Sequence, residues 1–148
     1  MMKRVPTIVV SGGFDPIHKG HVLMVREAAE YGNVIVLLNS DDWLIRKKGY
    51  KFMPFEERAY ILGSIKGVTI VANVDDSDGT VCAGLKRFKP DYFANGGDRY
   101  LTNTPEMEVC KELGITMLWN IGGGKIQSSS SLVTKAQYGK RVINGQEF

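Results

Sequence analysis

Short apolar runs alternate with amphipathic stretches along most of this chain. Thr7–Val10 and Val34–Leu38 are uninterrupted apolar or β-branched runs of strand length, a pattern typical of strands that are buried on both faces of a sheet. Between them, apolar residues recur at helical spacing over Lys19–Tyr31, and Gly32 is expected to end that helix. The same pattern predicts three further strands, at Val68–Ala72, Tyr92–Ala94 and Ile115–Trp119.

Helix start signals lie between these strands. Residues that cap a helix, or prolines and acidic residues in a first turn, precede the amphipathic stretches. These signals predict helices at Phe55–Ile65, Gly79–Phe88, Thr104–Leu113 and Ser128–Tyr138. Asp75–Asp78 is expected to cap the second of these helices. Ser40–Asp42 is expected to supply the cap of a shorter helical segment that contains Trp43, Leu44 and Ile45, and a basic loop is expected to follow at Arg46–Gly49.

The alternation of strands and helices predicts a Rossmann-like α/β fold, with a five-stranded parallel sheet and helices on both faces. The 148 residues suit a single domain over residues 1–148, and residues 139–148 are expected to form a mobile tail or an oligomer contact. Ligands bind such sheets beyond the carboxyl ends of the strands. Four polar or glycine-rich segments follow strands and are expected to meet there: Ser11–His21, Asn39–Lys48, Asn95–Arg99 and Ile121–Ser131.

Charge and composition narrow the class of partner. The net charge of +3 includes no basic stripe with interleaved aromatic residues, so an anionic small molecule is a better expected partner than nucleic acid. No run approaches the roughly 20 apolar residues that span a bilayer, and the first residues lack the features of a signal peptide. Cys82 and Cys110 show no paired spacing. We therefore expect a reduced, cytoplasmic protein with no membrane partner.

The segment Ser11–His21 carries the candidate chemistry. Its glycines allow the backbone to approach a ligand closely, and the start of the following helix presents free N–H groups and a partial positive charge. His18 and His21 are three residues apart at that helix start, so they share a face and can both donate hydrogen bonds to a phosphate chain. Gly20 between them leaves room for the ligand.

Other phosphate-binding and metal motifs explain this segment less well. The glycine spacing of a dinucleotide fingerprint is absent. A Walker loop needs serine or threonine after Gly-Lys, but Ile126 follows Lys125. A zinc site needs a third ligand, and the chain has only 2 histidines. A pair of phosphate-binding histidines is therefore the preferred interpretation.

At these histidines the chain resembles the cytidylyltransferase-like nucleotidyltransferases, whose His-x-Gly-His signature matches His18–His21. Within that superfamily it is similar to the adenylyltransferase domain of heptose-phosphate enzymes and to glycerol phosphate cytidylyltransferase. The resemblance covers about residues 5–133. Its further motifs are Asn39–Asp41, Met53–Arg58, Pro90–Asp91 with Gly96–Asp98, and Ser128–Ser130.

The resemblance implies transfer of a nucleoside monophosphate from a nucleoside triphosphate, bound with Mg²⁺, to a phosphorylated sugar or polyol, with release of pyrophosphate. A phosphate monoester has a second pKa of about 6, so the acceptor is already a dianionic nucleophile and needs no general base. The protein must then supply positioning and charge stabilisation during in-line attack. The heptose-phosphate motifs favour ATP, CTP is the alternative, and a homodimer is expected because such relatives often dimerise.

The resemblance also assigns roles to individual residues. His18 and His21 would act in catalysis by donating to the triphosphate, and Lys47 would neutralise phosphate charge from across the pocket. The expected nucleotide-binding residues are Gly12, Gly13, Phe14, His18, His21, Gly97, Asp98, Ser128, Ser129 and Ser130. The expected acceptor-binding residues are Ser11, Lys48, Arg58 and Arg99. No residue is assigned to the metal, because Asp15 is expected to fix the turn before the helix.

Structural roles remain open for several of these residues. The alternatives are solvated loop charges at Lys47 and Lys48, a helix-surface ion pair at Arg58, a turn at Asp98 and a helix cap at Ser128 and Ser129. Two positions depart from the family pattern. Gly13 replaces a threonine, for which Ser11 is a candidate substitute, and Gly122–Gly124 replaces an arginine, with Lys125 as the nearest cation. Since a fold does not imply an activity, a non-catalytic nucleotide-binding module is the alternative from another functional class.

Overall fold

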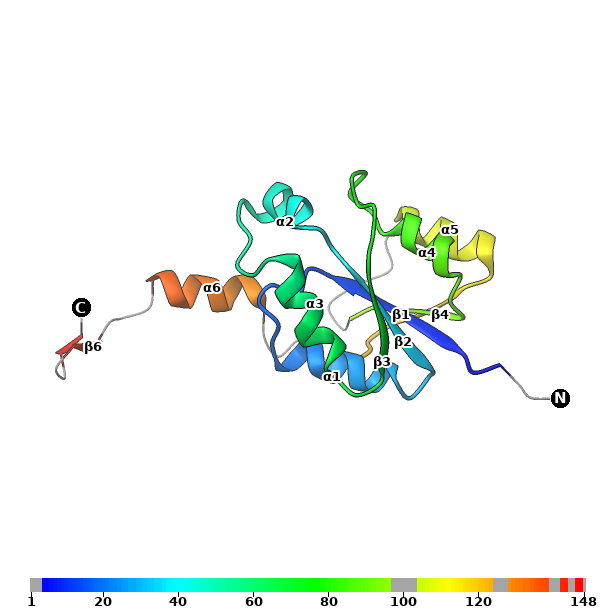
Figure 1. Ribbon diagram of the computed structural model, residues 1–148, viewed down its shortest axis with the longest axis horizontal. Helices are drawn as coiled ribbons and strands as arrows, with labels where there is room; N and C mark the ends of the chain where they lie inside the picture. Colours follow the sequence, from blue (N-terminus) through cyan, green and yellow to red (C-terminus); the bar gives the residue numbers. More distant parts are fainter. Residues whose placement is uncertain (1–3, 97–103, 124–127, 139–141, 144–145, 148) are drawn as a thin grey trace.

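Five parallel strands form the centre of the molecule in a computed structural model that describes residues 4–96, 104–123, 128–138, 142–143 and 146–147 (Figure 1). The strands are β1 (Thr7–Gly12), β2 (Asn33–Leu38), β3 (Val68–Asn73), β4 (Tyr92–Ala94) and β5 (Thr116–Leu118). Their order across the sheet is β3-β2-β1-β4-β5, and all neighbouring pairs are parallel. The predicted α/β fold class is therefore confirmed.

Helices cover both faces of this sheet. The described helices are α1 (Lys19–Ala28), α2 (Asp41–Lys48), α3 (Phe55–Gly63), α4 (Cys82–Phe88), α5 (Pro105–Leu113) and α6 (Ser129–Tyr138), of which α1, α3, α4 and α5 pack on the sheet. On one face Val9 and Leu37 pack with Leu85 of α4 and Cys110 of α5. On the other face the neighbouring strand residues, Val10 among them, pack with α1 and α3. Burial on both faces explains why β1 and β2 are continuously apolar in sequence.

The ends of some predicted elements differ from those observed. α1 ends at Ala28 rather than Tyr31, and α4 begins at Cys82 rather than Gly79. The prediction that Asp75–Asp78 caps α4 is wrong. Val81 occupies the N-cap, while the buried carboxylate of Asp76 accepts hydrogen bonds at the start of α2 instead.

The predicted basic loop at Arg46–Gly49 is largely helical. α2 continues to Lys48, and Gly49 ends it in the left-handed conformation at a φ of 85°. Arg46, Lys47 and Lys48 thus occupy the last turn of α2, where the helix dipole favours positive charge. Because adjacent residues on a helix point in different directions, Lys47 and Lys48 face different surroundings.

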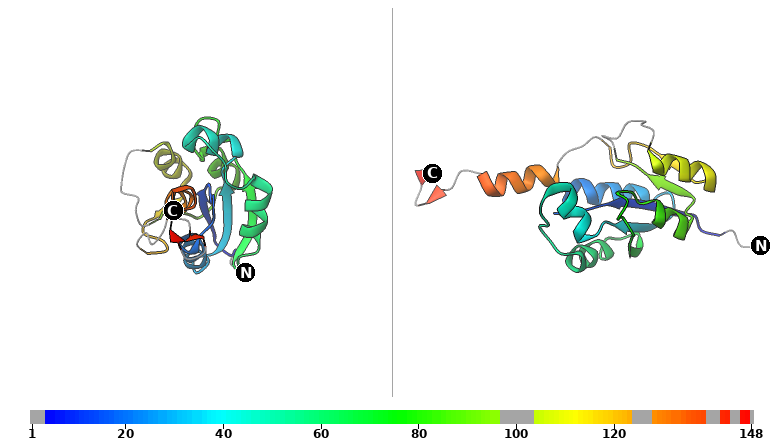
Figure 2. Two further views of the ribbon diagram at one scale, coloured as in Figure 1. Left: turned by 90° about the vertical axis from the view of Figure 1, so that its left-hand side faces the viewer. Right: turned by 90° about the horizontal axis from the view of Figure 1, so that it is seen from above.

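The C-terminal helix α6 extends away from the sheet, and the two termini lie at opposite ends of the molecule (Figures 1 and 2). Beyond α6, β6 (Val142–Ile143) pairs antiparallel with β7 (Gln146–Glu147). The sequence predicts only a tail over residues 139–148 and did not indicate this hairpin. The other residues of that tail lie outside the described part of the chain.

Candidate functional site

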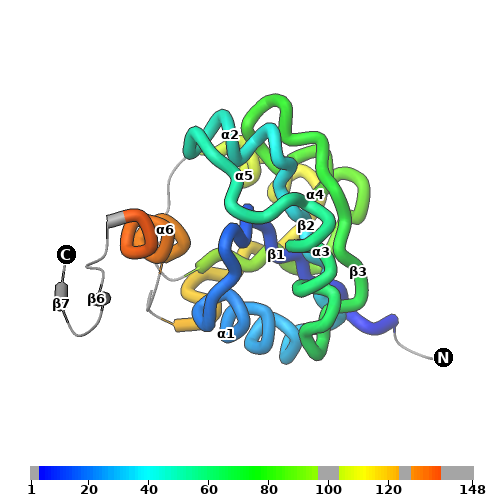
Figure 3. Tube along the Cα trace, turned by 60° about the vertical axis from the view of Figure 1, so that its left-hand side comes forward, coloured from blue at the N-terminus to red at the C-terminus, as the bar shows by residue number. Residues whose placement is uncertain are grey.

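The described parts of the four polar segments that follow the strands meet at one edge of the sheet, as the sequence predicts. α6 begins at this edge, beside the loop that joins β1 to α1 (Figure 3). Three hydrogen bonds join the segments: Asn39 N to Gly12 O (3.0 Å), Ile121 N to Asn95 O (3.0 Å) and Ser129 Oγ to Pro16 O (2.7 Å). This edge is the expected ligand-binding position in a parallel α/β sheet.

His18 and His21 lie at the first turn of α1, directly beyond β1. His18 is the N-cap residue, and its Nδ1 accepts a hydrogen bond from the backbone N–H of Gly20 (3.1 Å). The Nδ1 of His21 accepts from the backbone N–H of His18 (3.2 Å). The two imidazole rings stack with their centroids 3.8 Å apart, and the ring of Phe14 meets that of His21 edge to face at 4.8 Å.

These hydrogen bonds determine which nitrogen of each histidine carries the proton. A ring nitrogen that accepts an N–H bond carries no proton of its own, so each neutral imidazole is protonated at Nε2. Both rings then carry an Nε2–H donor at a helix N-terminus, where exposed N–H groups and the helix dipole also favour an anion. The geometry is suited to binding phosphate oxygens with neutral donors.

His21 is neutral over the whole physiological range. Burial, and then the nearby His18 and Lys48, lower the pKa of His21 from 6.5 to about 3. A protonated His21 would also place an Nδ1–H against the N–H of His18. The hydrogen-bonding role of His21 therefore does not depend on an imidazolium charge.

The low pKa of His21 predicts an acid-dependent loss of stability. Between pH 6.5 and about 3 the unfolded chain binds a proton at His21 and the folded chain does not, so stability falls as pH is lowered through this window. The contribution of this single group is at most about 1.4 kcal/mol per pH unit. Urea unfolding at about pH 7 and about pH 5 should show a smaller difference for His21→Asn than for the natural chain. An unchanged difference would contradict the assignment.

The two lysines at the end of α2 differ in burial, because Lys48 is half-buried and Lys47 is exposed. The charge of Lys48 helps to lower the pKa of His21. The pKa of Lys48 is itself lowered, by burial and by the charges of Arg58 and Lys47, although Asp15 opposes this shift. Lys47 is exposed, and its Nζ lies 5.8 Å from the centroid of the Trp43 ring. Both lysines belong to α2 and not to the loop that the sequence predicts there.

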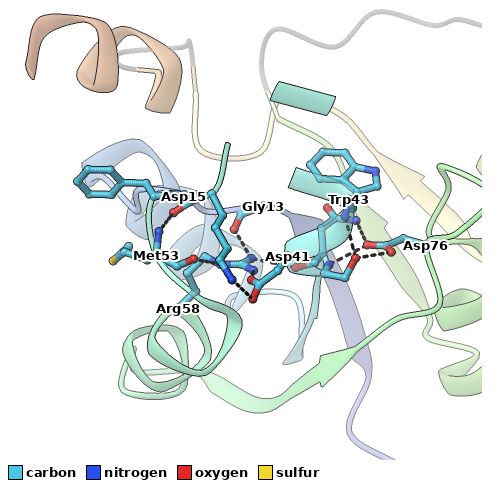
Figure 4. A network of polar contacts seen from close by, with 11 residues as sticks. Gly13, Asp15, Asp41, Trp43, Met53, Arg58 and Asp76 are labelled. Atoms are coloured by element: carbon cyan, nitrogen blue, oxygen red, sulfur yellow. Dashed lines mark hydrogen bonds and ion pairs between the residues drawn. The ribbon is translucent and has the colours of Figure 1, made fainter. Parts of the chain in front are cut away.

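Arg58 is the centre of a buried polar network beneath this edge (Figure 4). Its side chain is 1% exposed. Its guanidinium donates to the carbonyl oxygens of Met53 (2.9 Å), Gly13 (2.8 Å) and Asn39 (2.9 Å), and to Oδ1 of Asp41 (2.7 Å). Arg58 thereby holds together the loops after β1 and β2 and the segment before α3.

This network corrects the roles expected for Arg58. Arg58 does form an ion pair with a nearby acidic residue, Asp41. The prediction that this pair lies on the helix surface is wrong, because Arg58 is buried. Four of its donor contacts are to protein acceptors, which indicates that Arg58 positions the loops rather than binding an acceptor substrate.

Two buried carboxylates extend the network, and the sequence did not indicate their partners. Asp15 accepts from the backbone N–H groups of Phe52 and Met53, both at 2.6 Å. Asp76 accepts from the N–H (2.8 Å) and hydroxyl (2.7 Å) of Ser40. Asp15 therefore fixes the loop before α3 rather than the turn before α1. These partners are 36 to 38 residues away in sequence, so no local pattern could have shown them.

The serine segment meets the site through its hydroxyls. Ser128 caps α6, since its Oγ accepts from the N–H of Ser131 (3.0 Å), which confirms one of the two roles left open. Ser129 is buried against Pro16, two residues before His18, and Ser130 is exposed. Ser11 and Gly12 end β1 beside this loop. Four further candidates lie outside the described residues: Gly97, Asp98, Arg99 and Lys125.

The comparison with known families agrees with this geometry. Residues 9–119 match the model of a family described as Cytidylyltransferase-like. The chain belongs to the cytidylyltransferase-like family. The matched range extends from β1 to β5 and includes both histidines of α1 and the whole of α2.

Several curated relatives of this cytidylyltransferase-like chain support a nucleotidyltransferase as its general class. The FAD synthase of Ferroglobus placidus is 29% identical over 108 residues, which are 73% of this chain and 70% of the relative. The bifunctional protein HldE of Streptomyces coelicolor is 33% identical over 141 residues, or 91% of this chain, and that of Sulfurimonas denitrificans is 36% identical over 110 residues, or 72%. The chain spans only 29% and 22% of the length of these two HldE proteins.

A solved structure shares the fold of this family member. The lipopolysaccharide core biosynthesis protein from Thermoplasma volcanium superimposes with a TM-score of 0.65 at 21% identity, covering 78% of this chain and 94% of the other. This similarity supports the fold alone.

The described residues include neither a cluster of metal ligands nor a helix suited to crossing a membrane. Within the described ranges, no three His, Cys, Asp or Glu side chains gather as ligands for a metal ion. Asp15, the carboxylate nearest to the histidines in sequence, already accepts two backbone hydrogen bonds. No helix in the part of the chain that the structure describes combines the length and apolar character needed to cross a bilayer.

Proposed function

We propose that this chain transfers a nucleoside monophosphate from ATP to a phosphorylated sugar or polyol and releases pyrophosphate. The acceptor's phosphate oxygen forms a bond to the α-phosphorus while the bond from that phosphorus to the bridging oxygen of pyrophosphate breaks. The attack is in line and forms no covalent intermediate with the protein. The acceptor phosphate is largely dianionic at neutral pH, with a second pKa of about 6, so no residue has to remove a proton.

The observation that carries this proposal is the pair of stacked imidazoles at the N-terminus of α1. Both Nδ1 atoms accept backbone N–H bonds, so each neutral ring carries its proton on Nε2, the atom that would donate to a phosphate oxygen. Donors that are fixed before the substrate arrives stabilise charge in the transition state without the cost of reorganising. Lys48 adds a partly buried positive charge close to His21.

Magnesium would accompany the nucleotide rather than occupy a protein site. Mg²⁺ keeps several waters and commonly binds substrate phosphates with few protein ligands. This coordination suits a site whose described residues offer no cluster of metal ligands. When bound, the ion would neutralise part of the charge of the triphosphate.

The choice of ATP rests on similarity to relatives. FAD, the product named in one relative, contains an adenylyl group, and the HldE proteins match the chain over most of its length. The resemblance to glycerol phosphate cytidylyltransferase keeps CTP as the alternative nucleotide. Both nucleotides present the same triphosphate to the histidines, so the proposed chemistry is common to them.

A screen for pyrophosphate release tests the proposal. The chain is incubated with Mg²⁺ and ATP or CTP, and with glycerol 3-phosphate or one of a panel of sugar phosphates. Pyrophosphate is expected with ATP and at least one phosphorylated acceptor, and not with the same compounds lacking the phosphate. Preference for CTP would overturn the choice of nucleotide. Silence throughout the panel, with nucleotide binding retained in calorimetry, would favour a non-catalytic nucleotide-binding module instead.

A further inference from the structure

Helix α2 lies unusually close to the glycine loop that follows β1. A side-chain Cβ on Gly13 would be 2.7 Å from Cδ2 of Leu44 and 3.5 Å from Cζ3 of Trp43. The Leu44 side chain would have to shift for any larger residue at position 13, and the Trp43 ring lies at ordinary van der Waals distance from the same point. Trp43 therefore forms a wall of the same edge at which the histidine pair lies.

Lys47 lies one helical turn after Trp43, and its ammonium group lies over the indole ring. Its Nζ is 5.8 Å from the centroid of the Trp43 ring, within the range of a cation–π contact. Within the described residues, Lys47 forms no ion pair with a carboxylate. The contact with Trp43 restricts where the ammonium group can lie while leaving it exposed to an incoming anion.

Two of the carboxylates near Trp43, those of Asp41 and Asp76, are engaged elsewhere, whereas Asp42, which precedes Trp43 in α2, is exposed. Asp41 accepts from Arg58 and pairs with Lys51, and Asp76 accepts from Ser40. In Figure 4 the indole of Trp43 stands clear of this network. An anionic ligand at Lys47 therefore does not compete with Asp41 or Asp76 for the ammonium group.

A reaction between two anions needs positive charge at each of them, and α2 carries two adjacent lysines, Lys47 and Lys48. A dianionic acceptor that approaches a triphosphate is repelled unless positive charge lies on both sides of the reacting phosphorus. Lys48 is half-buried and its charge acts on His21, which is proposed to bind the triphosphate. Lys47 faces the Trp43 ring instead.

We propose that Trp43 and Lys47 form the acceptor subsite, in which Lys47 binds the phosphate monoester of the acceptor and Trp43 positions its ammonium group. This assignment rests on the proposed function and gives it a specificity determinant. Lys47 thereby changes from the expected neutraliser of the triphosphate to the residue that recognises the acceptor, and Lys48 takes the reverse change.

The test uses Trp43 as its own reporter. The chain has 2 tryptophans, so Trp119→Phe leaves Trp43 as the only source of indole fluorescence. Glycerol 3-phosphate is titrated into this variant in the presence of an ATP analogue with a methylene bridge between the α- and β-phosphates. A saturable change in fluorescence is expected with glycerol 3-phosphate and not with glycerol or an equal concentration of sulfate.

Matched lysine variants separate the two roles. Lys47→Met is added to the Trp119→Phe variant, where methionine keeps an unbranched side chain over the indole. It is expected to weaken the apparent affinity for glycerol 3-phosphate at least tenfold and to leave the affinity for ATP in calorimetry unchanged. Lys48→Met is expected to weaken ATP binding and leave the glycerol 3-phosphate response within about threefold, since its charge faces the histidines. An absent response, an equal response to glycerol, or a response unaffected by Lys47→Met would each overturn the subsite.

The role of Trp43 is tested separately from folding. In the complete reaction, Trp43→Leu is expected to raise the KM of the acceptor and leave the KM of ATP unchanged. Trp43→Phe is expected to have an acceptor KM close to that of the natural chain, because the phenylalanine ring also binds a cation. Equal effects on both KM values would indicate a structural role only and would overturn the positioning role. If the natural chain binds no ATP, the proposed function is wrong. The glycerol 3-phosphate titration, repeated without the ATP analogue, then still tests whether Trp43 and Lys47 bind a phosphate monoester.

Discussion

Replacing His18 with asparagine is expected to lower kcat by roughly 10²–10³-fold while leaving the fold intact. His18 has two functions that different atoms perform: its Nδ1 caps α1, and its Nε2–H is proposed to donate to the triphosphate. Asparagine is a favoured N-cap residue, so it replaces the first function and removes the second. His18→Ala removes both and is expected to lose roughly 1 kcal/mol of stability as well as activity.

The same separation applies to His21. The side-chain amide of glutamine approximates the Nε2–H donor, whereas the oxygen of asparagine approximates the Nδ1 acceptor that receives the N–H of His18. His21→Gln should therefore retain more turnover than His21→Asn. Initial rates of pyrophosphate release and thermal melting of each variant provide the measurement. Turnover within tenfold of the natural chain in both His18→Asn and His21→Asn would show that the imidazoles do not stabilise the transition state.

Those parts of the fold that depend on local sequence could be predicted from it. The continuous apolar run Val34–Leu38 indicates a strand buried on both faces, and β2 has five consecutive buried residues there. Thr104 caps α5 as predicted, and the cap of α2 is Ser40, one of the three residues predicted to supply it, because a hydroxyl that accepts an N–H three residues later is a local interaction.

The long-range polar contacts that hold the loops of the site together could not be predicted from local sequence. Asp76 follows β3 with acidic neighbours and resembles a helix cap in sequence, yet its partner is Ser40, 36 residues earlier. Arg58 resembles a surface cation on an amphipathic helix, yet it is fully buried. In both cases the parallel sheet brings distant loops together, and only the three-dimensional structure shows which polar group meets which.

The lysines of α2 show a second limit of sequence patterns. Consecutive cations predict a basic surface but not the direction of each side chain. Lys47 and Lys48 differ because the helix continues through them, so that Lys47 reaches over the Trp43 ring while Lys48 is half-buried. The extent of α2 therefore determines which of two identical residues serves the nucleotide in the proposed mechanism.

The buried network implies that Arg58 stabilises the arrangement on which the site depends. Arg58→Met is expected to lower the free energy of unfolding by roughly 3–5 kcal/mol, because it leaves three carbonyl oxygens and the carboxylate of Asp41 without this partner. For a chain of this size, that loss corresponds to a melting temperature lower by roughly 10 °C. Urea unfolding followed by circular dichroism provides the measurement.

Arg46→Met is the matched control for this prediction. Arg46 also donates to a backbone carbonyl, that of Asp76 at 2.9 Å, but its side chain is 50% exposed, so its loss is expected to cost less than about 1 kcal/mol. Arg58→Lys keeps the charge but cannot reach four acceptors, and it should fall between the two methionine variants. If Arg58→Met were no less stable than Arg46→Met, water would replace the guanidinium freely. The loops after β1 and β2 would then owe their position to the apolar packing of α1 and α3 rather than to this network.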